Sequence, residues 1–219
     1  MNNSLTIAKR ELKSYFDSPI AYIVMVTFLL ITGWMFFSSI FLINRADLRT
    51  LFMPSPFSPT MLLVILIPAV TMRLIAEERK TGTIELITTM PITDSELIIG
   101  KFIACFFLVA LSVGLTIFYA ITISTIGDLD WGPVISGYLG VFLFTSALIS
   151  IGLMVSTMTE NQIIAFIISF IIGAVLYFIY WLQVLLPPAI GSLVEFLSLS
   201  SHLENMARGV IDTRDILYY

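Results

Sequence analysis

Charged residues and cysteine are scarce in this chain of 219 residues. Asp, Glu, Lys and Arg together make up 12% of the sequence, and Cys105 is its single cysteine. A soluble domain normally carries about 25% charged residues, so this composition excludes an ordinary soluble protein. One cysteine also excludes an internal disulfide framework. We expect Cys105 to pack as a small apolar side chain.

The residues that carry most enzymatic and transport chemistry are missing as well. The sequence has no glycine-rich loop ending in Gly-Lys-Ser or Gly-Lys-Thr, and its single histidine, His202, has no Cys or His neighbours. The cores of its apolar runs contain no Asp, Glu, His, Lys or Arg. Proton-coupled transporters and intramembrane enzymes need such groups at membrane depth. We therefore expect no catalytic, metal-binding or cofactor-binding residue in this chain.

Long hydrophobic runs are what the sequence does contain. Hydrophobic residues make up 58% of it, and the mean hydropathy is +0.99. A helix needs roughly 20 apolar residues to cross the hydrocarbon core of a bilayer. Five uncharged runs satisfy this: Ser18–Asn44, Thr50–Met72, Phe102–Gly127, Trp131–Thr159 and Asn161–Val194. The sequence predicts an all-α polytopic membrane protein with one domain over residues 1–219.

Turn residues and small residues refine these runs. The predicted spans are Ile20–Ile43, Thr60–Ile75, Phe102–Ile126, Pro133–Thr157 and Gln162–Leu182, with Ser18 and Pro19 starting the first. Pro68 is expected to kink the second span, and the outer loop Asn44–Pro59 to be irregular. Small residues repeat every four positions at Ala165, Ser169 and Gly173, and at Ser146 and Ser150. Such rows serve packing within one subunit or a dimer face.

An amphipathic segment, residues 4–17, precedes the first span. Its apolar face consists of Leu5, Ala8, Leu12, Tyr15 and Phe16, whereas Lys9, Arg10 and Lys13 fall elsewhere. This pattern favours a helix lying in the membrane interface, and the alternative is a solvated start of the first span.

The distribution of Lys and Arg predicts the orientation. If the spans alternate, one side receives Lys9, Arg10, Lys13, Arg73, Arg79, Lys80 and Lys101. The other side receives Arg45, Arg49, Arg208 and Arg214. Because basic residues are enriched on the cytoplasmic side, the sequence predicts a cytoplasmic N-terminus.

The segment 77–95 is the most charged part of the chain. Glu77, Glu78, Arg79 and Lys80 are expected to extend the second span beyond the membrane, and Gly82 to end that helix in a left-handed conformation. Thr83 then caps a short helix, Ile84–Met90, with Glu85 near its N-terminus. Pro91 ends this helix, and Asp94 or Ser95 caps the next. The short helix either transmits the movement of a bound partner or rests as a linker on the headgroups.

The same segment carries a resemblance to a known family. The residues Ile67-Pro-Ala-Val-Thr-Met-Arg73, Glu77-Glu78-Arg79, Thr81-Gly82-Thr83, Glu85-Leu86, Met90-Pro91-Ile92 and Gly100-Lys101 resemble permease subunits of type-2 ABC exporters. The nearest group is the gliding-motility-type ABC permeases of bacteria. The tail from His202 through Arg208, Asp212, Arg214 and Asp215 is also similar to that group.

The resemblance implies a multi-pass protein of the bacterial inner (plasma) membrane. Two permeases, either copies or paralogues, would assemble with two ABC ATPase subunits that bind ATP and Mg; nucleic acid is not an expected partner. The segment Thr81–Pro91 would be the coupling helix, and residues 4–17 the interfacial connecting helix. Residues 187–208 would form an outer re-entrant segment of two short helices that dip partly into the outer leaflet. Such permeases have six spans. Since the five runs leave one missing, we expect this sequence to be a fragment rather than a departure from the pattern.

The resemblance also assigns roles to particular residues. The ATPase-docking set is Glu77, Glu78, Arg79, Thr81, Gly82, Thr83, Glu85 and Pro91. Glu77 and Glu78 are expected to pair with Lys9, Arg10 or Lys13 of the interfacial helix. Arg79 and Lys80 would face acidic groups of the ATPase or phospholipids. The leading function is an ABC exporter permease that forms the substrate path, and the alternative is a non-transporting scaffold of a motility or secretion machine.

Overall fold

A computed structural model describes residues 3–43, 47–89, 92–182 and 187–219, and throughout these ranges the regular elements are helices. Five helices are long and apolar enough to cross a membrane. The prediction of an all-α, polytopic membrane protein with five spans in this sequence is therefore confirmed.

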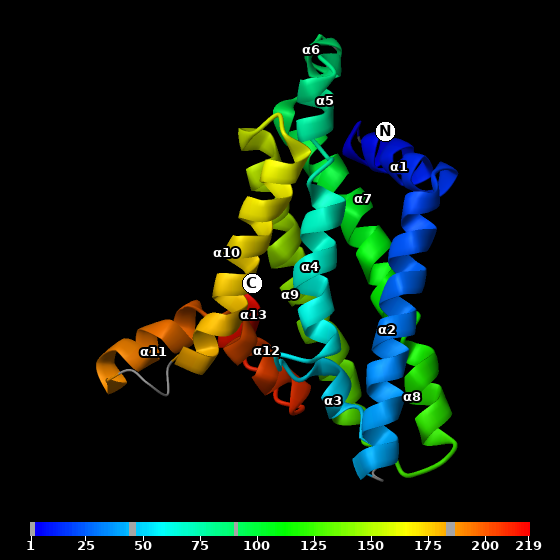
Figure 1. The fold of residues 1–219 in the computed structure, drawn as a ribbon, viewed down its shortest axis with the longest axis vertical. Helices are drawn as coiled ribbons and strands as arrows, with labels where there is room; N and C mark the ends of the chain where they lie inside the picture. Colours follow the sequence, from blue (N-terminus) through cyan, green and yellow to red (C-terminus); the bar gives the residue numbers. More distant parts are fainter. Residues whose placement is uncertain (1–2, 44–46, 90–91, 183–186) are drawn as a thin grey trace.

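Figure 1 shows the long helices running side by side. They are α2 (Pro19–Ile43), α4 (Pro59–Thr71) continued by α5 (Ala76–Lys80), α7 (Asp94–Gly114) continued by α8 (Ile117–Ser124), α9 (Trp131–Met158) and α10 (Gln162–Leu182). The shorter helices are α1 (Asn3–Asp17), α3 (Arg49–Phe52), α6 (Thr83–Thr88), α11 (Pro188–Leu197), α12 (Leu199–Ala207) and α13 (Thr213–Tyr218). We name the two ends of the bundle the α6 end and the α3 end.

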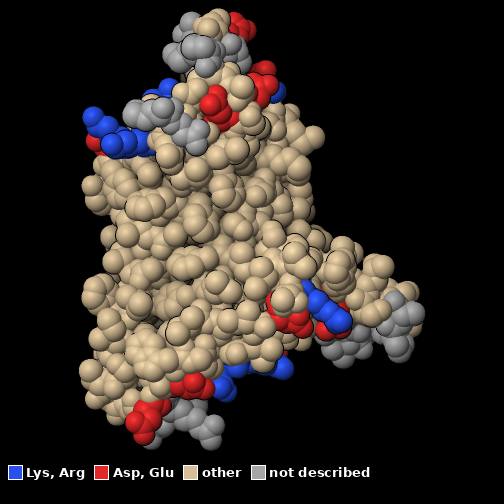
Figure 2. All heavy atoms as spheres, turned by 180° about the vertical axis from the view of Figure 1, so that it is seen from behind, with Lys and Arg blue, Asp and Glu red and all other residues tan. Residues whose placement is uncertain are grey.

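Charged side chains gather towards the two ends of the molecule. Figure 2 shows acidic and basic residues around the α6 end and towards the α3 end, with a broad uncharged belt between them. A hydrocarbon layer requires such a belt, because a charged side chain inside it is costly. The surface therefore agrees with the five spans.

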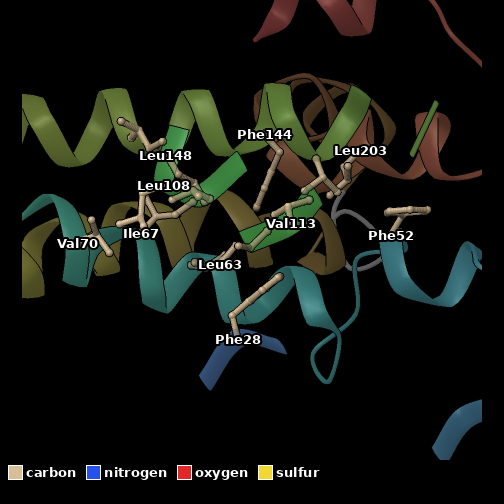
Figure 3. Packing of buried hydrophobic residues seen from close by; sticks show 14 of the residues in the cluster. Phe28, Phe52, Leu63, Ile67, Val70, Leu108, Val113, Phe144, Leu148 and Leu203 are labelled. Carbon is tan, nitrogen blue, oxygen red and sulfur yellow. The ribbon is translucent and has the colours of Figure 1, made fainter. Parts of the chain in front are cut away.

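The centre of the bundle is α9, which packs against α4, α7, α10 and α12. Figure 3 shows Leu148 of α9 together with Ile67 of α4 and Leu108 of α7. All three side chains are almost inaccessible to solvent. Since lipid tails are as apolar as leucine, close packing rather than removal from water holds these helices together.

A glycine sets the distance between α4 and α9. A Cβ atom at Gly152 would lie 2.1 Å from Thr71 Oγ1 and 2.8 Å from Thr71 Cβ. Thr71 is itself fully buried, so it has little room to move. The two backbones approach this closely because position 152 has no side chain.

Replacing Gly152 with alanine is therefore expected to destabilise the bundle by about 1–3 kcal/mol through overpacking. Gly114 is the matched control, because a Cβ atom there meets nothing within 4 Å. Thermal unfolding of both variants in mild detergent measures the difference. Equal stability of Gly152→Ala and Gly114→Ala would contradict the close approach of α4 and α9.

The row of small residues in α10 packs within the subunit. Ala165, Ser169 and Gly173 are buried, and a Cβ atom at Gly173 would contact Leu148 of α9 and Val64 of α4. Of the two interpretations, packing within one subunit and a dimer face, the first therefore describes the row in α10. On α9, by contrast, Ser150 is exposed.

Most spans begin where the turn residues predict. Ser18 Oγ donates to Tyr15 O and accepts from Ile20 N, which separates α1 from α2 as expected. The helix that leads into the third span begins at Asp94, but it is interrupted between α7 and α8, which was not predicted. At the interruption, the Thr116 hydroxyl lies 2.6 Å from Val113 O and 2.8 Å from the Tyr138 hydroxyl. These side-chain bonds compete with the regular helical pattern.

The loop predicted to be irregular contains the short helix α3. Leu51 and Phe52 on α3 are buried, and Phe52 contacts the Tyr138 ring with the centroids 4.9 Å apart. Aromatic packing on α9 thus orders part of this loop. The segment 187–208 forms two short helices, α11 and α12, as the resemblance implies. Their depth in a membrane stays a prediction.

Candidate functional site

The α5–α6 segment projects beyond the uncharged belt at the α6 end (Figure 1). Its turn lies at Gly82, whose φ of 71° is in the left-handed region, and Gly82 N donates to Arg79 O at 3.1 Å. A residue with a side chain is disfavoured in this conformation. The predicted role of Gly82 in ending the helix is confirmed.

The start of α6 differs by one residue from its prediction, which placed the first helical residue at Ile84. Thr83 is the first residue of α6 and its hydroxyl lies 2.9 Å from Thr81 Oγ1 and 3.3 Å from Glu78 O. The Thr83 hydroxyl thus donates to a carbonyl of α5, which links the two short helices. Helix α6 ends at Thr88, Glu85 is exposed, and Pro91 lies outside the described residues.

A buried serine of α9 supports the base of this segment. Ile75 N and Ala76 N both donate to Ser156 Oγ at 3.1 Å, and the Ser156 hydroxyl donates to Met72 O at 3.3 Å. These groups lie between α4 and α5, where the helical hydrogen bonds are interrupted. Backbone groups buried in a membrane protein must find partners inside the protein. Ser156 supplies them, so it fixes the direction in which α5 leaves the bundle.

Sequence reasoning missed Ser156. One serine among the apolar residues of the fourth span gives no sign of its partner, which lies 80 residues earlier in the chain. Pro68 indicates that the second span is irregular. It does not indicate which helix supplies hydrogen-bond partners to the backbone groups left free by the irregularity.

A second support is a buried cluster of Lys101, Glu78 and Glu11. Lys101 is 1% exposed, and its Nζ lies 2.7 Å from Glu78 Oε1 and 3.3 Å from Glu11 Oε1. These residues belong to α7, α5 and α1, respectively. A buried ammonium needs carboxylate partners, because removing one charge from water is costly unless it is paired. The cluster therefore joins three helices at the base of the projecting segment.

This cluster corrects the predicted ion pairs. Glu77 and Glu78 were expected to pair with Lys9, Arg10 or Lys13, but Glu77 pairs with Arg73 at 3.0 Å and Glu78 with Lys101. The basic residues of α1 point elsewhere: Arg10 pairs with Glu11, and Lys9 and Lys13 are exposed. Lys101 is among the basic residues that predict the orientation and among those that carry the resemblance, but no ion pair is predicted for it from the sequence. Its burial follows from the packing of α1 on α7.

Helix α1 packs tightly along the start of α7. A Cβ atom at Gly100 would lie 2.7 Å from Ile7 Cβ, and Asn3 Nδ2 donates to Glu96 Oε2 at 3.2 Å. The buried face of α1 therefore consists of Ser4, Ile7 and Ala8. Leu5, on the predicted apolar face, is 58% exposed within the protein, and the contact of that face with the membrane interface stays a prediction.

The cap of α7 also differs from its prediction. Thr93 is the N-cap: its hydroxyl accepts from Glu96 N, and the Glu96 carboxylate accepts from Thr93 N. This reciprocal arrangement satisfies two donors, which Asp94 or Ser95 as the cap does not. Glu96 also accepts from Asn3 of α1, so the side chain that completes the cap of α7 also holds α1.

The remaining charged residues of the segment are at its surface. Arg79 and Lys80 lie at the end of α5 and are exposed, as are Thr81, Gly82 and Thr83. No group of three His, Cys, Asp or Glu side chains in the described part of the chain is placed to hold a metal ion. The α5–α6 segment is thus a charged projection with exposed side chains.

The tail residues that resemble the family meet at the opposite side of the bundle. His202 Nδ1 lies 2.6 Å from Asp215 Oδ1, and Asn205 Nδ2 donates to Asp215 Oδ2 at 3.2 Å. Asp212 caps α13 by accepting from Arg214 N at 2.9 Å. These contacts tie α13 to α12, which explains the spacing of the tail residues by local structure.

Comparison with known proteins identifies the family. No curated protein matches the chain. A family model described as "ABC-2 family transporter protein" matches residues 56–201, about two thirds of the chain. The match includes the α5–α6 segment, Lys101 and Ser156. It does not distinguish the gliding-motility-type group. The chain belongs to the ABC-2 family of transporter proteins.

Proposed function

We propose that this chain is the permease subunit of an ATP-driven exporter, and that its α5–α6 segment docks a separate ABC ATPase. Family membership supports a permease of an ABC transporter. The observation that carries the docking role is the charged α5–α6 projection, whose base is held by Ser156 and Lys101. A partner that moves α6 thereby moves α5, α1 and α7 together.

The proposal includes the orientation and the other partners. The α6 end faces the cytoplasm of a bacterium, because α1 and α5, which lie at this end, carry Lys9, Arg10, Lys13, Arg79 and Lys80. ATP and Mg bind to the ATPase subunit, which supplies the energy. A second permease, either a copy or a paralogue, completes the substrate path across the plasma membrane.

Substitution of Gly82 tests the docking role. Gly82→Val is expected to lower ATPase co-purification by about tenfold, because a β-branched residue costs roughly 1–2 kcal/mol in the left-handed conformation. Nothing lies within 4 Å of a Cβ atom there, so the effect comes from the backbone. Gly82→Asn is the matched control, since asparagine tolerates this conformation. The measurement is quantitative mass spectrometry of material purified through the tagged permease.

Equal ATPase recovery with Gly82→Val and wild type would count against docking through this turn. Transport and scaffolding are separated by a further assay on the purified complex. An exporter predicts that some lipid, peptide or saccharide stimulates ATP hydrolysis, whereas a scaffold binds the ATPase without such stimulation.

A further inference from the structure

A charged cleft lies between α1 and the α4–α5 junction at the α6 end. Its volume is about 510 Å³. Three basic and three acidic side chains line it: Arg10, Arg73, Lys101, Glu11, Glu77 and Glu78. Their formal charges cancel, so the cleft does not favour a ligand with net charge.

The basic side chains at the mouth retain donors for a ligand. Arg10 is 54% exposed and donates through Nη2 to Glu11. Arg73 is 36% exposed and donates through Nε and Nη2 to Glu77. A guanidinium has five N–H donors, so both residues have donors left after these contacts. Guanidinium groups recognise phosphate oxygens by charge-assisted hydrogen bonds.

The acidic side chain at the mouth fits the other half of a zwitterion. Glu77 is 42% exposed, and its carboxylate has acceptor capacity beyond its two contacts with Arg73. A ligand ammonium donates three hydrogen bonds and is attracted to such a carboxylate. The same carboxylate repels a ligand that carries only negative charge.

The remaining walls place the cleft at the edge of the membrane. Ile20 at the start of α2 and Leu74 after α4 are apolar, and Tyr15 of α1 also lines the cleft. Burial raises the pKa of the Tyr15 phenol well above its usual value, so it is a neutral donor. An amphipathic helix that covers a cleft with a charged rim and apolar walls is suited to the headgroup region.

From these observations, the geometry points to a binding site for the headgroup of a zwitterionic aminophospholipid such as phosphatidylethanolamine. Its phosphodiester accepts from Arg10 and Arg73, its ammonium donates to Glu77, and its acyl chains leave along Ile20 towards the bilayer. The site includes the Lys101 cluster in its lining, so a bound lipid stabilises the packing of α1 on α7. This inference does not depend on the identity of the transported substrate or on ATPase binding.

Native mass spectrometry of the full chain, released from detergent with equal amounts of phosphatidylethanolamine and phosphatidylglycerol, tests the site. Wild type is expected to retain phosphatidylethanolamine preferentially. The double variant Arg10→Gln/Arg73→Gln should lose more than about tenfold in retention, because about tenfold is the effect of one charge-assisted contact and the variant removes two. Lys9→Gln/Lys13→Gln is the matched control, because these exposed residues of α1 lie outside the cleft. Its retention should equal that of wild type.

Glu77→Lys distinguishes recognition from loss of folding, since it should reverse the preference to phosphatidylglycerol. Excess glycerophosphoethanolamine, the headgroup without acyl chains, should leave the lipid bound. Displacement by this soluble compound would show that the occupant is a soluble phosphodiester, which overturns the lipid assignment. Equal retention of both lipids by wild type, or an unchanged preference in Glu77→Lys, would also overturn it.

Discussion

Lys101→Met is expected to lower the free energy of unfolding by about 3–5 kcal/mol, because it leaves the Glu78 carboxylate without its counter-ion and Glu11 with Arg10 alone. Lys101 Nζ contacts both Glu78 and Glu11, whose side chains are each 17% exposed. Methionine preserves most of the side-chain volume, so the lower free energy of unfolding reflects the missing charge rather than a cavity. The link that Lys101 makes between α1 and α5 should be lost, and ATPase co-purification should fall as a result.

Thermal unfolding in mild detergent and proteolysis of α1 measure this effect. The double variant Lys101→Met/Glu78→Gln should recover part of the stability, because one uncompensated carboxylate is removed. Glu77→Gln is the matched control: its ion pair with Arg73 is largely exposed, so about 0–1 kcal/mol is expected. If Lys101→Met were as stable as the wild-type protein, the cluster would not hold the three helices together.

Ser156→Ala is expected to destabilise the protein by about 2–4 kcal/mol, since two buried backbone amides lose their acceptor. The two amides, of Ile75 and Ala76, lie at the base of α5. We expect the direction of α5 to become variable while the spans still insert. The damage should therefore be greatest in the α5–α6 segment.

Hydrogen exchange of the α5–α6 segment, together with thermal unfolding, tests this expectation. Ser150→Ala is the matched control on the same helix, because Ser150 is exposed and its hydroxyl bonds only to Ser146 O within α9. Similar exchange rates in the two variants would contradict the support role of Ser156.

The spans could be predicted from the sequence because their signal is local. Membrane thickness fixes the length of an apolar run, and Ser18-Pro19 marks the start of the first span. The predicted bounds of the fifth span, Gln162–Leu182, are the observed ones. The glycine turn was predictable for the same reason, since Gly82 is the residue that takes a positive φ.

The contacts that support the candidate site could not be predicted in this way. Ser156 and Lys101 act on residues 80 and 23 positions away in the chain, and neither partner follows from periodicity. The cap was predicted one or two residues late because Thr93, Asp94 and Ser95 are all good caps, and only the return bond from Glu96 favours Thr93. Helix packing, not local preference, decides these features.

Site-directed cross-linking tests the docking role of α6 most directly. With Cys105 replaced by alanine, a single cysteine is introduced at Glu85 in α6, or at Asp128 in the connection between α8 and α9 as the control; both positions lie outside the long helices. If α6 docks the ATPase, we expect cross-links to a co-expressed ABC ATPase from position 85 and none from position 128. Cross-links from position 128 alone, or an ATPase that co-purifies without cross-linking at position 85, would contradict it.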